Sequence, residues 1–98
     1  MSNKIAKTIK WGFKDCVEFL KEYGFVNSDV KGSHYQFTGR ISGEERIVDV
    51  IYNWREKNTQ SLLTIKRIIK QSGIPEEYFE EWEKRKWRRR IFHPEIIF

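Results

Sequence analysis

The sequence is poor in cysteine, histidine and proline, and it has no long apolar run. Its single cysteine, Cys16, excludes an internal disulfide, and the two histidines are too few to complete a Cys/His zinc site. No segment approaches the roughly 20 apolar residues of a membrane-spanning helix, and the N-terminus lacks the apolar run and cleavage site of a signal peptide. We therefore expect a cytoplasmic protein that packing stabilises, with no metal and no small-molecule cofactor.

Several catalytic motifs are also missing: a Gly-rich phosphate loop, an HExxH pair and a Ser-His-Asp set. What the 98 residues do contain is 39% hydrophobic and 15% aromatic side chains, which is sufficient for one small core. The formal net charge of +5 favours a polyanionic partner such as RNA. The composition thus indicates one compact domain with a basic surface.

The first third of the chain changes character at Trp11. Residues 1–10 are polar and basic with isolated apolar positions, and we interpret them as a loosely held N-terminal extension. From Trp11, apolar residues recur at three- and four-residue spacing, which predicts an amphipathic helix. Gly24 is suited to the left-handed position after a helix, so we expect the helix to end at Tyr23.

Three short runs then predict strands at about 25–30, 33–41 and 45–53. The dipeptides Lys31-Gly32 and Ser42-Gly43 separate them and are short enough for hairpins, so we expect an antiparallel meander. In the middle run, alternation separates apolar from polar side chains. The apolar face holds Tyr35, Phe37 and Ile41, and the polar face holds His34, Gln36, Thr38 and Arg40. In the third run, Asp49 suggests that Val48, Val50 and Tyr52 face inward.

Two helices are expected after this sheet. One spans about 61–71, with Leu62, Ile65, Ile68 and Ile69 as its buried stripe. The other opens at Pro75, turns Tyr78, Phe79 and Trp82 inward, and continues to about residue 90. The predicted fold class is therefore α+β, with the helices segregated to one face of a three-stranded sheet. The order α-β-β-β-α, here with an additional C-terminal helix, is also that of double-stranded-RNA-binding domains.

The most informative local feature is the turn Lys31-Gly32-Ser33-His34, which delivers a histidine to the polar face of the central strand. Imidazole is the side chain best matched to proton transfer near neutral pH. Lys31, Ser33 and the amides around Gly32 can hold a phosphate beside it. An ordinary exposed strand histidine is the alternative interpretation of His34.

Three segments resemble the HicA toxin family, in the family's order and at suitable spacing. They are 19–25 (FLKEYGF), 31–37 (KGSHYQF) and 64–74 (TIKRIIKQSGI), so the resemblance covers about residues 12–82. The Gly-Ser-His element is its most specific part. The resemblance implies a double-stranded-RNA-binding-like fold, metal-independent cleavage of mRNA as an mRNA interferase, and neutralisation by a HicB-type antitoxin. The family's catalytic histidine corresponds to His34.

This chain departs from the family in two ways. Many members follow the third strand with a Pro-His step, where this chain has Tyr52-Asn53-Trp54. It also adds residues on both sides of the shared region, which gives an N-terminal extension at 1–10, a HicA-like domain at 11–82 and a basic C-terminal extension at 83–98. Substrate handling can differ from that of the family accordingly.

Basic and aromatic side chains supply the remaining candidates for RNA contacts. Lys31, Gly32, Ser33 and Arg40 are assigned to the reacting phosphate, and Lys66, Arg67 and Lys70 to the RNA backbone. For each cation alone, a solvated surface position is the alternative. Tyr52 and Trp54 either stack on bases or pack, and 84–90 either binds a polyanion or complements the helix dipole. The general acid is unassigned; His93 qualifies only if the tail folds back.

Two functions therefore follow from the sequence. The first is a toxin of a type II toxin-antitoxin system, an endoribonuclease in which His34 acts in general acid/base catalysis. The second is a catalytically inert RNA-binding module of the same fold, in which the basic surfaces bind RNA and His34 plays no part. Loss of cleavage on His34→Ala distinguishes them.

Overall fold

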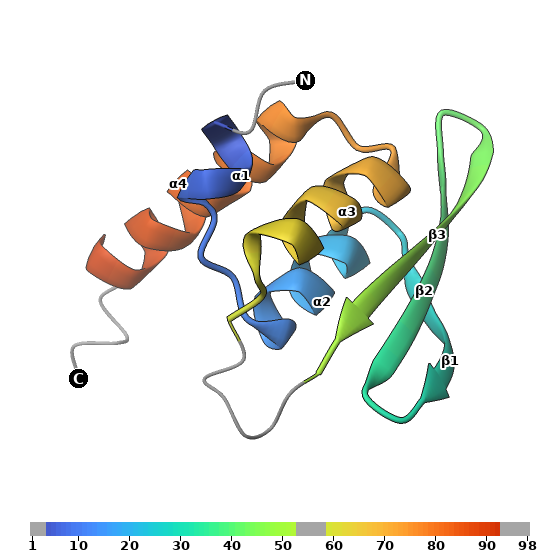
Figure 1. The fold of residues 1–98 in the computed structure, drawn as a ribbon. Helices are drawn as coiled ribbons and strands as arrows, with labels where there is room; N and C mark the ends of the chain where they lie inside the picture. The colour runs from blue at the N-terminus through green and yellow to red at the C-terminus, as the bar shows by residue number, and fades with distance from the viewer. Residues whose placement is uncertain (1–3, 53–58, 93–98) are drawn as a thin grey trace.

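A computed structural model describes residues 4–52 and 59–92 of the chain, with the side chains of residues 5–52 and 59–86. Within these residues, four helices and three strands follow one another (Figure 1). The elements are α1 (Lys4–Thr8), α2 (Phe13–Glu22), β1 (Val26–Lys31), β2 (His34–Ile41), β3 (Glu44–Ile51), α3 (Leu62–Ser72) and α4 (Glu76–Phe92). The described residues include no helix long and apolar enough to cross a membrane.

The three strands form one antiparallel sheet in the order β1-β2-β3, which confirms the predicted meander. Both connections contain two residues, and in the second one Ser42 and Gly43 both have positive φ angles, as tight hairpin turns require. Phe37 pairs with Val48, and Tyr35 pairs with Val50. Because paired residues share a face, this register places the apolar side chains of β2 and β3 together.

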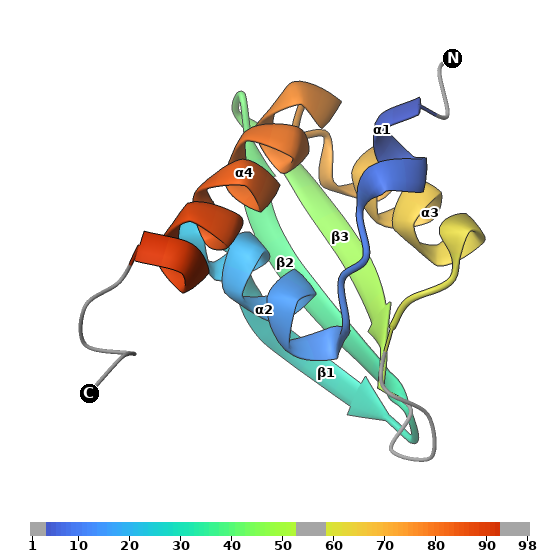
Figure 2. The same cartoon turned by 90° about the vertical axis from the view of Figure 1, so that its left-hand side faces the viewer.

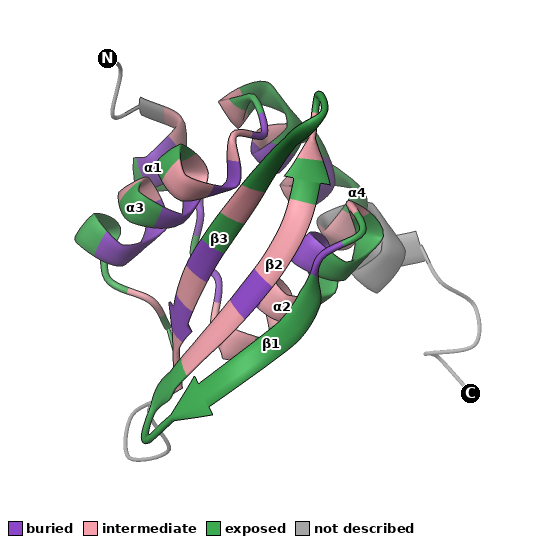
Figure 3. Cartoon of the chain, turned by 90° about the vertical axis from the view of Figure 1, so that its right-hand side faces the viewer, coloured by how far each residue is buried: buried purple, intermediate pink, exposed green. Residues whose placement is uncertain are grey.

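All four helices lie on one side of the sheet (Figures 1 and 2), so the predicted α+β class is confirmed. Phe37, Val48 and Val50 are buried on the inner face of the sheet. The other face carries exposed and half-buried side chains and is not covered by any described element (Figure 3). The even-numbered residues of β2, including His34, and the odd-numbered residues of β3, including Asp49, project from this open face.

The prediction that residues 1–10 are loosely held is wrong for the part that the structure describes. Residues 4–8 form α1, and Ala6 and Ile9 are each only 3% exposed. Helix α1 contacts both α3 and α4. A five-residue helix has little intrinsic stability, so burial of these two side chains is what holds it in place. The isolated apolar positions are the inward side of this segment.

A cluster of aromatic rings joins α2 and α4 behind the sheet. Trp11 is fully buried, and its ring contacts those of Phe19, Phe79 and Trp82. The Trp11 indole N–H donates a hydrogen bond to a carboxylate oxygen of Glu83. Burial of large rings with edge and stacking contacts supplies much of the core energy of a small domain. The predicted boundary at residue 83 therefore lies within a helix that is anchored on both sides of it.

Lys86 provides a second, polar attachment of α4. Its Nζ atom lies 2.9 Å from Oδ2 of Asp15 on α2, and the two side chains are 12% and 21% exposed. An ion pair with this little solvent is less screened than a surface pair. Lys86 therefore has a structural role, and it is not among the cations that are free to contact RNA.

Two apolar positions differ from the predicted burial. Leu62 is 38% exposed and Tyr78 is 50% exposed, whereas both were expected to face the core. Leu62 is the first residue of α3, directly after the N-cap Ser61, and the buried residues of this helix begin two positions later, at Thr64. Tyr78 lies at the margin of the buried stripe of α4, where its ring meets that of the half-buried Tyr23. The predicted burial of Ile65, Ile68, Phe79 and Trp82 is confirmed.

Candidate functional site

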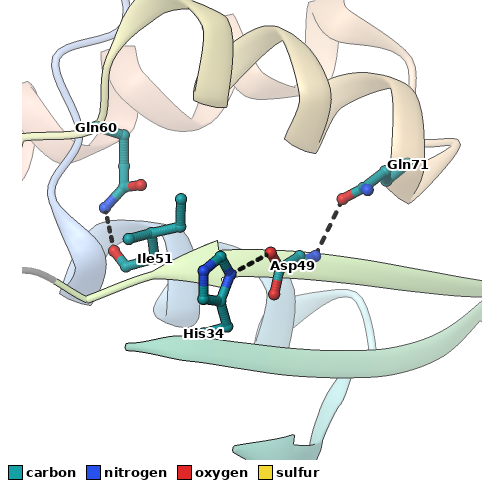
Figure 4. Close-up of polar contacts among 5 residues, drawn as sticks. All are labelled: His34, Asp49, Ile51, Gln60 and Gln71. Atoms are coloured by element: carbon teal, nitrogen blue, oxygen red, sulfur yellow. Dashed lines mark hydrogen bonds and ion pairs between the residues drawn. The ribbon is translucent and has the colours of Figure 1, made fainter. Parts of the chain in front are cut away.

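The candidate site is built around His34, the first residue of β2. Its side chain is 54% exposed on the open face of the sheet, and its Nδ1 atom lies 2.9 Å from Oδ2 of Asp49 on β3 (Figure 4). The cross-strand neighbour of His34 is Ile51, so Asp49 is its diagonal neighbour. The contact therefore depends on the strand register as well as on the two residue types.

The Asp49 contact determines which imidazole nitrogen is available for chemistry. A carboxylate oxygen accepts hydrogen bonds only, so the Nδ1 atom of a neutral His34 carries the proton that Asp49 accepts. The Nε2 atom then has a free lone pair. The carboxylate also stabilises the imidazolium that forms when Nε2 takes up a proton, which is the behaviour expected of a general base with an orienting partner.

Two glutamine side chains hold the strand that carries Asp49. The backbone N–H of Asp49 donates to Oε1 of Gln71, at 3.0 Å, near the end of α3. Nε2 of Gln60 donates to the carbonyl oxygen of Ile51, at 2.7 Å. Figure 4 shows both glutamines reaching down to the backbone of β3 on the side away from β2. These two hydrogen bonds hold the backbone of β3 at Asp49 and at Ile51, and so fix the position of the carboxylate that contacts His34.

The turn before His34 is held from the opposite strand. The carbonyl oxygen of Ser33 accepts a hydrogen bond from the backbone N–H of Tyr52, at 2.8 Å. The ring of Tyr52 packs edge-on against Phe13 of α2, and the same Phe13 ring contacts Tyr35. These half-buried rings lie on the inner side of the sheet end. They fix the turn in position relative to α2 while His34 projects from the opposite face.

Lys31, Gly32 and Ser33 are all exposed, and Lys31 is the cross-strand neighbour of His34 on the β1 side. Cross-strand neighbours have Cα atoms about 4.5–5.5 Å apart, which brings the Lys31 ammonium within reach of a group bound at His34. Gly32 has φ +59°, and a Cβ there would meet no neighbouring atom, so its role is conformational. The structure thus brings Lys31, Ser33 and His34 together.

Arg40 is placed elsewhere. It lies near the far end of β2, and its guanidinium donates to the carbonyl oxygen of Gly43, at 2.9 Å. Six residues of extended strand separate it from His34, which corresponds to roughly 20 Å. The predicted contribution of Arg40 to the phosphate at His34 does not fit this distance, because the side chain is too short to reach that end of the strand.

The predicted basic residues of α3 lie on the helix that carries Gln71. Arg67 and Lys70 are exposed and Lys66 is half-buried. In the described part of the chain, none of the three forms an ion pair. They therefore remain available to a polyanion beside the edge of β3. Trp54 and His93, in contrast, fall outside the described residues, as does any statement about the side chains of 87–90.

Asp49 is the residue of this site that sequence reasoning missed. The alternation of the third strand indicated that Asp49 points away from the core, but not which side chain it would meet. Two strands can pair in many registers, and each register places a different residue opposite Asp49. The hairpin turn at Ser42-Gly43 determines the register observed. Counting outward from that turn pairs Gln36 with Asp49 and places Asp49 diagonal to His34.

Comparison with known protein families, characterised proteins and solved structures gives no match for this chain. Within the residues that the structure describes, no three His, Cys, Asp or Glu side chains are grouped closely enough to hold a metal ion.

Proposed function

We propose that this chain is the toxin of a type II toxin-antitoxin system, a metal-independent endoribonuclease that cleaves mRNA and so blocks translation. The observation that carries the proposal is the contact between His34 and Asp49 on the open face of the sheet, beside an exposed lysine. Exposed polar pairs contribute little to stability. Stability therefore does not explain this contact between a histidine and an orienting carboxylate, whereas a role in proton transfer does. The resemblance of three sequence segments to the HicA family gives the activity.

RNA carries its own nucleophile, so the residues needed are few. In the proposed reaction, Nε2 of His34 removes the proton of a ribose 2′-hydroxyl, whose oxygen attacks the adjacent phosphorus and displaces the 5′-oxygen. Asp49 accepts the Nδ1–H and stabilises the imidazolium. Lys31 and Ser33 offset the charge that develops on the phosphorane. The general acid that protonates the leaving oxygen is unassigned, and the products carry 2′,3′-cyclic phosphate ends.

The proposal includes a fold, a location and two partners. The fold is that of double-stranded-RNA-binding domains, which the order of α2, the three strands and α3 supports. The location is the cytoplasm. The partners are mRNA, which Lys66, Arg67 and Lys70 contact through its phosphates, and a HicB-type antitoxin that neutralises the toxin. One positioned base contributes about 10²- to 10⁴-fold to the rate, so a slow nuclease is expected.

The test is cleavage of a long single-stranded RNA in the presence of EDTA. Wild type, His34→Ala and His34→Gln are compared, after circular dichroism has shown that all three are folded. Thr38→Ala is the matched control, because Thr38 lies on the same strand and the same face but away from the His34 contact. We expect fragments with 2′,3′-cyclic or 3′-phosphate ends from wild type and Thr38→Ala only. A 2′-deoxy substitution at a mapped cleavage position should block cleavage there.

The cations of α3, which form no ion pair with a described residue, give a second candidate function, an inert RNA-binding module. This module would bind RNA with a steep salt dependence and would cut nothing. If none of the proteins cleaves RNA while all of them bind it, the nuclease proposal is wrong and the binding module replaces it. If cleavage by His34→Ala equals that of wild type, His34 is not the base.

A further inference from the structure

A second surface feature lies on the helix side of the molecule, between Tyr23, which follows α2, and α4. Figure 2 shows α2 and α4 next to each other in the helical layer. A groove of about 300 Å³ is present there. The ring centroids of Tyr23 and Tyr78 are 6.0 Å apart with their planes tilted by 51°. The groove is lined by Tyr23, Glu77, Tyr78, Glu81 and Arg85.

The two tyrosines differ in what they offer. Tyr78 is 50% exposed, so its ring is accessible to a partner. Tyr23 is half-buried, and burial raises the pKa of its hydroxyl, with the neighbouring Glu22 acting in the same direction and Arg85 opposing it. Its phenol therefore stays neutral at physiological pH. The Tyr23 ring packs against the buried ring of Phe19, with 4.9 Å between centroids, whereas the ring of Tyr78 is half exposed to solvent.

The rim of the groove is acidic. Glu77, Glu81 and Arg85 follow one another at four-residue spacing and so lie on one face of α4. Arg85 contacts Glu22 of α2, with 3.6 Å between Nη2 and Oε2. Neither Glu77 nor Glu81 forms an ion pair with a cation whose side chain the structure describes. A chain with a net charge of +5 thus has a locally negative groove.

We propose that this groove binds an arginine side chain presented by a basic segment of a partner protein. A guanidinium stacks on the exposed face of Tyr78, as cations do on aromatic rings. Its N–H groups then donate to the carboxylates of Glu77 and Glu81, which match its planar fork. RNA is disfavoured here because the same carboxylates repel phosphates. The inference does not depend on the proposed nuclease activity, which concerns the other side of the molecule.

The test uses the full chain, isotope-labelled for NMR, and an end-blocked tripeptide, Gly-Arg-Gly. The control peptide contains citrulline, which has the shape of arginine without its charge. We expect saturable shifts at Tyr78 and Glu81 with the arginine peptide, with a dissociation constant on the order of 1 mM. The citrulline peptide should give no saturable shift, and raised salt should weaken binding.

Variants locate the binding site. The double variant Glu77→Gln with Glu81→Gln should weaken binding at least about tenfold, because both charge-assisted hydrogen bonds are lost. Tyr78→Ala should weaken it as well, and Glu80→Gln, on the same helix outside the groove, should not. The proposal is overturned if arginine and citrulline peptides bind equally, if the double variant binds like wild type, or if an RNA oligonucleotide shifts the groove signals instead.

Discussion

The Nδ1 atom of His34 and the Oδ2 atom of Asp49 meet at 2.9 Å across two strands, although the register pairs His34 with Ile51. Asp49 acts through His34, as a positioning residue in the proposed nuclease. The Asp49→Asn variant preserves shape but removes the negative charge that orients and stabilises the imidazolium. We expect the rate constant for cleavage to fall on the order of tenfold or more, with less effect than the loss of His34 itself. The KM for RNA should not rise, because a negative charge beside the phosphate is removed.

The measurement is steady-state cleavage of a defined RNA, with kcat and KM determined separately. Glu45→Gln is the matched control, since Glu45 is also an acid of β3 on the open face but faces Arg40 rather than His34. A rise in KM with an unchanged rate constant would contradict the positioning role. Equal losses in Asp49→Asn and Glu45→Gln would point to a general effect of surface charge.

A second prediction concerns α1. Ile9→Ala removes a side chain that is 3% exposed and leaves a cavity where α1 meets α3 and α4. Substitutions of this kind lower the free energy of unfolding by about 2–4 kcal/mol. Urea denaturation measures the loss. Lys10→Ala, one residue further on and exposed, should change the free energy of unfolding by less than about 0.5 kcal/mol. A neutral Ile9→Ala variant would mean that the N-terminal segment is not part of the core.

A third prediction follows from the close approach of Gly39 and Phe25. A Cβ at position 39 would lie 2.8 Å from Cγ of Phe25, a ring that is itself 1% exposed. Gly39→Ala should therefore destabilise the fold by about 1–3 kcal/mol through overpacking. Phe25→Ala removes the three ring atoms nearest to position 39, Cγ, Cδ1 and Cδ2, so the double variant should be more stable than the sum of the two single effects predicts. Strict additivity in this double-mutant cycle would rule out the contact as the cause.

A fourth prediction concerns alkaline pH. Burial, with a smaller contribution from the charge of Asp15, raises the pKa of the Cys16 thiol from 9.0 to about 12. Between these two values the unfolded chain loses a proton that the folded chain keeps. The contribution of Cys16 to stability is therefore complete below pH 9 and falls as the pH rises, by at most about 1.4 kcal/mol per pH unit.

Urea denaturation of wild type and Cys16→Ala at about pH 8 and about pH 10 tests this linkage. The free energy of unfolding of wild type should fall by roughly 1 kcal/mol more than that of the variant over this interval. Tyrosines and lysines titrate in both proteins, so the comparison isolates the thiol. Parallel pH dependence of the two proteins would contradict a raised pKa for Cys16.

The fold class and most of the candidate site could be predicted because they depend on local patterns. Helix periodicity located α2 and α3 within one or two residues, and strand alternation placed His34 on the open face. Relationships between segments distant in the sequence could not be predicted in the same way. Asp49 meets His34 only through the register of a hairpin, and Arg40 shares the polar parity of His34 yet lies at the other end of the strand.

The wrong predictions of which side chains are buried have a related cause. Apolar periodicity shows which side of a helix is apolar. It does not show along how much of the helix the neighbouring elements cover that side. Leu62 lies at the start of α3, beyond the extent of its packing, and Tyr78 lies beside Phe79 on a helix that shares its apolar residues between the core and a surface groove. In the N-terminal segment, the two apolar residues Ala6 and Ile9 are too few to predict a helix. Helix α1 is held by its packing against α3 and α4.

The side chains that reach the backbone of β3 restrict how a partner can join this sheet. Gln71 and Gln60 occupy the outward N–H of Asp49 and the outward carbonyl of Ile51. At the other edge, the register shift between Asn27 and Asp29 and the hydrogen bond from the Val30 N–H to the Asp29 carboxylate interrupt β1. A fourth strand would therefore find few unpaired groups in line at either edge. We therefore expect a molecule that reaches His34 to lie across the strands, on the open face of the sheet, and not to extend the sheet at an edge.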